Sequence, residues 1–219
     1  MRTLRWTLLF LIGWLVTVPA TARQHDHDPD EAVTGGGHLP EGWQARLDRA
    51  RASLDQVRFV ETEAGYHITL GPAAIFYRPE DTASGSYTAR ATFVLNKPSA
   101  HPEAYGLFVG GRDLNGPGQD YLYFLVRQNG QYLVKHRAGA ETHTLVDWTP
   151  HEAVRVPGER GTSENTLAVR ATPERVAFLV NGVEVTALDR VPMLNTDGIA
   201  GLRVNHNLDV TVRDFAIER

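Results

Sequence analysis

The chain has 219 residues, of which 42% are hydrophobic and 22% are charged, proportions that are ordinary for a globular protein and fit one large domain. Its 26 acidic residues outnumber its 22 basic ones, and no run of five Lys and Arg occurs, which argues against a nucleic-acid partner. Cysteine is absent, which excludes disulfides, thiolate metal sites and a cysteine nucleophile.

The first 22 residues have the pattern of a secretory signal peptide. Arg2 and Arg5 precede an apolar run over residues 6–18, and residues 20–22 (Ala-Thr-Ala) supply a small-x-small cleavage site. We therefore expect cleavage after residue 22 and a mature protein in the periplasm or outside the cell, with no membrane span. An uncleaved anchor is the alternative, but the run is shorter than the ~20 apolar residues of a spanning helix.

Residues 23–40 read as a flexible linker, because they combine acids, three consecutive glycines and two prolines without any apolar period. Side chains with metal-ligand chemistry occur in it: His25, Asp26, His27, Asp28, Asp30 and Glu31. Ordering them around a metal would cost chain entropy, so a solvated tail is the preferred interpretation. The folded domain is then expected over residues 41–219.

From residue 57 the sequence is organised in short strands. Residues 42–53 suggest a turn or two of helix covering one end of the domain, and strands follow at 57–60, 66–70, 73–77 and 86–95, separated by Gly and Pro. Alternation over 86–95 predicts one buried and one wet face. About a dozen strands should fold as two packed antiparallel sheets, since open sheets rarely exceed ~10 strands.

Two Asn-Gly dipeptides, Asn129-Gly130 and Asn181-Gly182, stand between alternating apolar runs. Both central positions of a type I′ turn need positive φ, so each dipeptide predicts a two-residue β-hairpin. In the last strand the apolar phase slips by one residue near Arg213-Asp214, which predicts a bulge or a change of buried face there.

Several segments resemble the laminin-G-like and concanavalin A-like jelly rolls over residues 55–218. They are Tyr105-Gly106-Leu107-Phe108-Val109-Gly110-Gly111, Tyr123-Phe124-Leu125-Val126-Arg127, Val180-Asn181-Gly182, Asp197-Gly198-Ile199-Ala200-Gly201-Leu202 and Asp214-Phe215. Within these folds the chain is most similar to the secreted bacterial 3-keto-disaccharide hydrolase-like domains. The resemblance implies a two-sheet sandwich and says little about activity, because one sandwich hosts many functions.

Two features of hydrolytic relatives are missing. The Asn-Ser-Gly segment that often enters one strand is replaced by residues 103–106 (Glu-Ala-Tyr-Gly), and the Glu-x-Asp-x-x-Glu pattern of the laminarinase type does not occur. A glycosidase of the common kind needs two carboxyls flanking the bond. Glu103, Asp113 and Asp120 could converge from the loops around the central strands, or they could be solvated rim charges.

The loop of residues 111–120 also offers oxygen ligands for calcium at Asp113, Asn115 and Asp120. It shares only the opening of an EF-hand pattern and lacks the closing Glu, and the same residue types form tight turns. We expect no required cofactor, with calcium in this loop as the alternative.

A two-residue turn at Asn129-Gly130 places Arg127 opposite Tyr132 and Tyr123 opposite His136. These four side chains would then share an open face, with Trp148 as a platform at its rim. Aromatic planes with Arg and His donors suit a sugar, whose C–H face stacks on a ring while its hydroxyls form hydrogen bonds. The simpler interpretation is a half-buried sheet face with aromatic and cation-π pairs, and a Trp148 that only closes the core.

The same pairing places Lys135 and Arg137 on the core face, so the opposite assignment of faces stays open. The sequence predicts an exported module that binds a carbohydrate or glycoconjugate. A glycoside hydrolase acting on 3-keto- or ordinary disaccharides is the first alternative. A protein-interaction domain that uses exposed sheet edges is the second.

Overall fold

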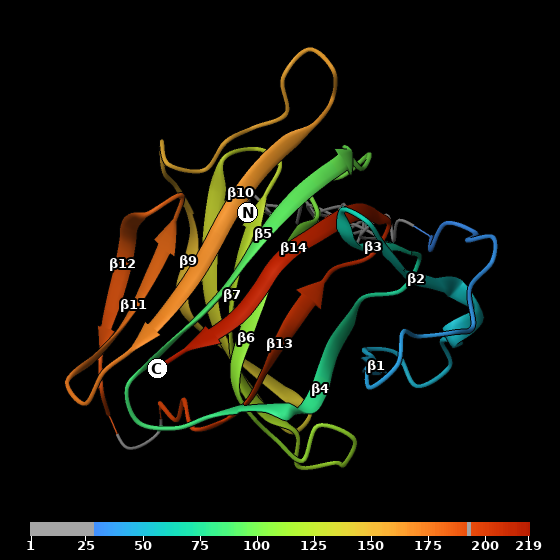
Figure 1. Ribbon diagram of the computed structural model, residues 1–219. Helices are drawn as coiled ribbons and strands as arrows, with labels where there is room; N and C mark the ends of the chain where they lie inside the picture. Colours follow the sequence, from blue (N-terminus) through green and yellow to red (C-terminus); the bar gives the residue numbers. More distant parts are fainter. Residues whose placement is uncertain (1–28, 192–193) are drawn as a thin grey trace, which may run out of the picture.

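The structure is a computed structural model that describes residues 29–191 and 194–219. It contains two seven-stranded antiparallel sheets packed face to face (Figure 1). The predicted all-β jelly-roll sandwich is therefore confirmed. In the described residues no helix is long and apolar enough to cross a membrane, and the predicted signal peptide of residues 1–22 lies outside them.

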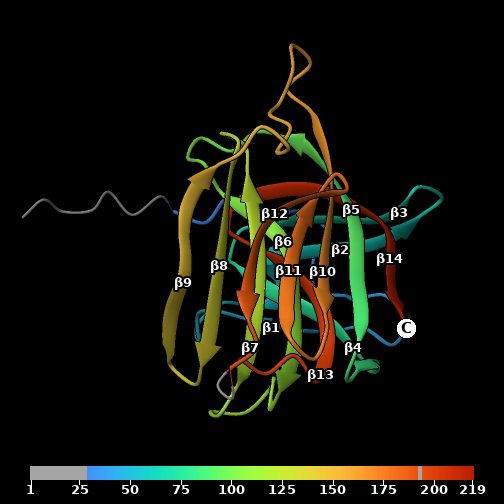
Figure 2. The same ribbon diagram turned by 90° about the vertical axis from the view of Figure 1, so that its left-hand side faces the viewer.

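The first sheet has the strand order β1 (Gln44–Leu47), β4 (Ala74–Ala83), β13 (Gly198–Val204), β6 (Ala104–Arg112), β7 (Asp120–Arg127), β8 (Gln131–Ala138) and β9 (Glu141–Pro150). The second sheet has the order β12 (Val183–Asp189), β11 (Arg175–Val180), β10 (Ser163–Ala171), β5 (Tyr87–Lys97), β14 (Leu208–Glu218), β3 (Gly65–Leu70) and β2 (Val57–Thr62). The edge strands β9 and β12 lie on the same side of the sandwich, which faces the viewer in Figure 2.

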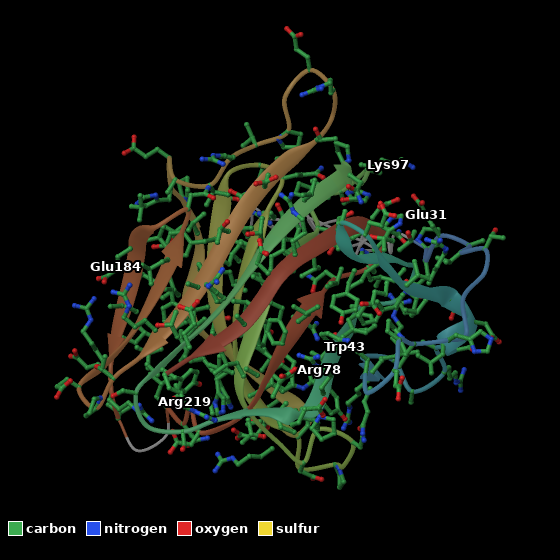
Figure 3. The ribbon with its side chains drawn as sticks, in the orientation of Figure 1. Glu31, Trp43, Arg78, Lys97, Glu184 and Arg219 are labelled. Atoms are coloured by element: carbon green, nitrogen blue, oxygen red, sulfur yellow. The ribbon has the colours of Figure 1, made fainter. Side chains whose placement is uncertain are left out.

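The main core fills the space between the two sheets. Alternation along β5 supplies Tyr87, Ala89, Ala91, Phe93 and Leu95, all buried, because successive side chains of a strand point to opposite faces. Trp43 closes one end of this core against Phe59 and Tyr66, and the Arg78 guanidinium lies 5.3 Å from its ring centroid (Figure 3). The space between the two sheets is thus filled mainly by apolar side chains.

The segment of residues 42–53 differs from the expected helical turn. It contains β1, which pairs with β4 at the edge of the first sheet, and only residues 54–56 form a 3-10 turn, capped by Ser53. Leu47 pairs with Ala74 and packs against the core. Pairing with the edge of β4 therefore decides the structure here, because the helical pattern of these residues is weak. The edge strand carries Asp48 to the outer face of the first sheet.

Part of the predicted linker is packed against the sandwich. The Asn207 side chain accepts a hydrogen bond from the Glu31 backbone N–H at 2.7 Å and donates one to the Pro29 carbonyl at 2.9 Å. Gly37 donates its N–H to the Leu54 carbonyl. Residues 29–40 therefore do not behave as the free linker that their composition indicates, because long-range partners satisfy their backbone.

Two local predictions in the C-terminal half are confirmed. Asn181 and Gly182 have φ values of 52° and 82°, as a type I′ hairpin between β11 and β12 requires. The register of β14 shifts between Arg213 and Ala216, and Asp214 has a φ of 54°, so the phase slip does mark a bulge.

Candidate functional site

The central hairpin does not have the predicted two-residue turn. β7 ends at Arg127 and β8 begins at Gln131, so three residues link them, with a hydrogen bond from the Gly130 N–H to the Arg127 carbonyl. Gly130 has a φ of 82°, whereas Asn129 does not have a positive φ. This is a three-residue loop with glycine in the left-handed position, and it shifts the pairing by one residue.

The shift reverses the predicted faces of β8. Arg127 pairs with Gln131, Tyr123 with Lys135 and Leu122 with His136. Because a slip of one residue moves every side chain to the other face, the prediction that Tyr123, Arg127, Tyr132 and His136 share one surface was wrong.

Tyr132 and His136 lie on the inner side of the first sheet. Tyr132 is only 5% exposed, and its hydroxyl donates a hydrogen bond to the Val185 carbonyl of β12 at 3.0 Å. Nε2 of His136 lies 3.2 Å from Oδ2 of Asp120 at the end of the sandwich. Neither lines the groove described below, and Tyr132 has the role of a core residue.

Tyr123, Arg127 and Trp148 do lie together on the outer face of the first sheet. Tyr123 belongs to a second hydrophobic cluster on this face, separate from the main core. Its other buried members are Ile75, Tyr77, Ala104, Phe108, Leu114, Tyr121, Leu125 and Leu133, and Trp148 and Ile199 pack against it. Tyr123 is 8% exposed, and burial raises the pKa of its hydroxyl. This cluster forms the apolar floor of the outer face.

A distortion of β9 places Trp148 on this face. Val146 packs against the main core, and strict alternation would send Trp148 the same way. The pairing with β8 shifts register between Tyr132 and Val134, opposite this position, and Trp148 packs against the outer cluster instead. The Arg127 guanidinium lies 4.0 Å from the Trp148 ring centroid, a cation-π contact.

These residues form one wall of a groove of about 350 Å³, which we call the outer groove. Its lining residues come from β7, β8, β9, the end of β13 and the β5–β6 loop: Pro102, Glu103, Tyr123, Leu125, Arg127, Leu133, Lys135, Trp148, Arg203 and Asn205. The lining therefore combines an aromatic wall with charged and amide side chains.

Arg203 is the most buried charge of the outer groove, at 8% exposed. Its Nη1 and Nη2 donate to the two Asp48 carboxylate oxygens at 2.8 and 2.6 Å, and its guanidinium lies 5.3 Å from the Tyr123 ring centroid. Burial alone would raise the pKa of Asp48, but the charge and hydrogen bonds of Arg203 hold that pKa below its usual value. Burial alone would lower the pKa of Arg203, but the charge and hydrogen bonds of Asp48 outweigh burial and raise the pKa of Arg203 above its usual value.

Glu103 and Asn205 supply the acceptors of the outer groove. Nε2 of His206 lies 2.8 Å from Oε1 of Glu103, and Nδ1 of the same ring lies 3.6 Å from Oδ1 of Asp30. Oδ1 of Asn205 and Nε of Arg203 are buried and have no hydrogen-bond partner among the described residues. Both residues line the outer groove, and these two are the unsatisfied buried polar atoms of its lining.

The remaining cations of the outer groove lack a carboxylate partner. Arg127 donates to the neutral amide oxygens of Asn129 and Gln131, and its burial lowers its pKa. Within the described residues no ion pair within 4.0 Å involves Lys135. Two positive charges thus face the outer groove without a direct counter-charge.

The calcium candidates of the 111–120 loop are each engaged by protein groups. Asp113 accepts the Gly118 N–H at 2.8 Å, Asn115 accepts the Tyr77 hydroxyl at 2.8 Å, and Asp120 pairs with Arg112 and His136 at 3.2 Å. Across residues 29–191 and 194–219 no group of three His, Asp or Glu side chains is arranged to hold a metal ion. Calcium binding in this loop stays a prediction.

The sequence reasoning missed Arg203, Asn205 and Lys135 as site residues. Arg203 and Asn205 lie about a hundred residues from Glu103, and only strand pairing between β13 and β6 brings them there. The sequence did carry a signal for Lys135. It stands two residues after Leu133 on β8, so both side chains lie on the face opposite Tyr132.

No protein-family model and no curated protein matches the chain. Solved structures do match its fold. The carbohydrate-binding module CBM66 from Bacillus subtilis superposes with a TM-score of 0.59 and 11% identity over 86% of this chain and 100% of that chain. A protein of unknown function with a galectin-like fold, also from Bacillus subtilis, gives a TM-score of 0.56 and 12% identity over 80% and 88%.

A variant of alginate lyase A1-II′ gives a TM-score of 0.54 and 12% identity over 81% of this chain and 94% of that chain. At these identities the likeness concerns the backbone alone. The chain is an all-β sandwich with a galectin-like and concanavalin A-like jelly-roll fold.

Proposed function

We propose that this protein is an exported module that binds carbohydrate or glycoconjugate chains in the outer groove. The proposal rests on one observation: Trp148, backed by the Arg127 guanidinium at 4.0 Å, forms an aromatic wall beside buried, unpartnered polar atoms of Asn205 and Arg203. A sugar presents an apolar C–H face and a ring of hydroxyls, so it needs such a combination. Export is part of the proposal and depends on the predicted signal segment.

The fold comparison supports the proposal at a coarse level. CBM66 is described as a carbohydrate-binding module, and its whole length aligns with this chain. The same fold also occurs in an alginate lyase, so fold alone does not separate binding from catalysis. Whether this chain binds or cleaves a sugar therefore depends on the residues of the outer groove.

A glycan panel tests the proposal directly. Titration calorimetry with oligosaccharides should give binding that Trp148→Ala reduces at least tenfold, since loss of a stacked aromatic contact costs about 1.4 kcal/mol or more. Tyr132→Phe is the control. Tyr132 faces the main core, so this substitution should leave the affinity for the oligosaccharide unchanged. Full affinity in Trp148→Ala would refute the outer groove as the site, and a panel without any binder would refute the function.

Glu103 favours a second candidate function, hydrolysis of 3-keto- or ordinary disaccharides. Its carboxyl lines the outer groove and contacts His206, an arrangement that could hold a proton near a glycosidic oxygen. It is the one acid among the lining residues, however, whereas common glycosidases use two. Turnover of 3-keto-glycosides that Glu103→Gln abolishes would favour catalysis; binding without turnover would favour the module.

A further inference from the structure

The outer groove carries more charge than the binding of a neutral sugar would need. Three of its lining residues are cations, Arg127, Lys135 and Arg203, and one is an acid, Glu103, in a chain whose formal net charge is -4. Asp48 satisfies Arg203 through both carboxylate oxygens. Glu103 lies 2.8 Å from Nε2 of His206, so the lining cations with no carboxylate within 4.0 Å among the described residues are Arg127 and Lys135.

Arg127 is held in place by its neighbours, and Lys135 lies on the same face of the sheet. Arg127 is oriented by the Trp148 ring on one side and by the Asn129 and Gln131 amides on the other, so its fork is fixed before binding. Lys135 projects from the interior of β8 beside Leu133, on the same face. A half-buried lysine in the middle of a strand is unusual without a counter-charge, which marks the position as a site for an anion.

The backbone spacing of the two cations leaves room for more than one acidic group in the ligand. Gln131, the strand partner of Arg127, and Lys135 are four residues apart on β8, a separation of about 13 Å at ~3.3 Å per residue. An oligosaccharide that lies along the strand presents acidic groups to each cation.

We infer that the ligand of the outer groove is an acidic glycan, a chain of sugars bearing carboxylate or sulfate groups. Arg127 and Lys135 would contact two acidic groups, Trp148 would stack on the sugar between them, and Asn205 would accept a hydroxyl. This inference rests on the proposed function and adds the chemical class of its ligand. Guanidinium and ammonium groups recognise both kinds of anion, so the experiment must separate them.

Three oligosaccharide probes of equal length form the test: an oligouronate, a sulfated oligosaccharide and a neutral oligosaccharide. We expect the wild-type protein to bind at least one acidic probe about tenfold or more tightly than the neutral one. Its affinity should fall as salt is raised, because the Debye length shrinks from about 10 Å at 0.1 M to about 3 Å at 1 M. Whichever acidic probe binds better identifies the anion.

Lys135→Gln should weaken the acidic probe about threefold to tenfold and leave the neutral probe unchanged. Lys97→Gln is the matched control, since Lys97 is the other lysine of the chain and lies at the end of β5 in the second sheet (Figure 3). In the unmutated protein, amine-directed acetylation read by mass spectrometry should show the acidic probe protecting Lys135 but not Lys97.

The outcomes separate the two claims. Equal binding of acidic and neutral probes, or acidic binding that Lys135→Gln does not change, overturns the acidic-glycan inference and leaves sugar binding in place. No binding of any probe, with no protection of Lys135, overturns both. Loss of the acidic probe in Lys97→Gln but not in Lys135→Gln would place the site elsewhere and overturn both claims for this groove.

Discussion

Asp48→Asn tests the ion pair that supports the floor of the outer groove. The substitution keeps the shape of the side chain and removes its charge, so the Arg203 guanidinium, 8% exposed, loses the carboxylate that accepts two hydrogen bonds at 2.8 and 2.6 Å. An uncompensated buried cation then remains beside Tyr121 and Tyr123. We expect the folded state to be destabilised.

The magnitude follows from the exposure of the two partners. Breaking a fully buried pair by removing one partner costs ~3–5 kcal/mol. The side chain of Asp48 is 32% exposed, so solvent screens part of the interaction and water can reach Arg203 after the change. We therefore expect a loss of about 1–3 kcal/mol in the free energy of unfolding. Glu218→Gln breaks the exposed Arg90–Glu218 pair and should cost less than about 1 kcal/mol.

The pH dependence of the free energy of unfolding tests the ion pair more specifically. Because Arg203 lowers the pKa of Asp48 in the folded state, the contribution of Asp48 is fully present above its unfolded pKa of ~3.9 and disappears as pH falls through the lower folded value. Urea unfolding followed by tryptophan fluorescence should show a wild-type advantage over Asp48→Asn at pH 7 that shrinks below about pH 4. An equal difference at both pH values, or none at pH 7, would refute the ion-pair argument.

Three further changes test the register and the packed N-terminal segment. Tyr132→Phe should cost about 1 kcal/mol by leaving the half-buried Val185 carbonyl without its hydroxyl donor, measured by urea unfolding. Asn207→Gly keeps a residue that tolerates the φ of 54° but removes the contacts to residues 29–31, so it should cost about 1–2 kcal/mol and make that segment the first site of limited proteolysis. Gly182→Ala meets no atom within 4 Å, so any loss, about 1 kcal/mol, must come from its φ of 82° and not from a clash.

The two Asn-Gly dipeptides show what local sequence can predict. At Asn181-Gly182 the type I′ turn forms, and the Asn181 side chain is held by the Thr166 N–H and the Ala153 carbonyl. At Asn129-Gly130 the same dipeptide forms a longer loop, whose Gly130 carbonyl accepts the His151 N–H. The dipeptide predicts a hairpin in both places, but tertiary contacts choose the loop length, and the loop length decides the faces.

The strands and the sandwich were predictable because alternation is a local property of the chain. The outer groove was predictable only in part, from Tyr123, Arg127 and Trp148 and from Glu103 as a candidate acid. The Arg203–Asp48 pair joins residues 155 positions apart, and the position of Trp148 depends on an irregularity in β9. Neither leaves a trace in the spacing of residues along the sequence.

The energetics of the cations explain why the three-residue loop is favoured. With a two-residue turn, Lys135 and Arg137 would point between the sheets, where an unpaired charge costs several kcal/mol, and Tyr132 would leave the core. With the observed register both cations reach the outer face, and the Tyr132 ring packs 6.3 Å from that of Phe124. Lys135, which we assign to ligand binding, therefore also stabilises the register that exposes it. An apolar residue in place of Lys135 could be buried between the sheets without cost, so it would weaken the preference for the observed register as well as remove the charge. Lys135→Gln removes the charge and keeps a polar side chain at this position.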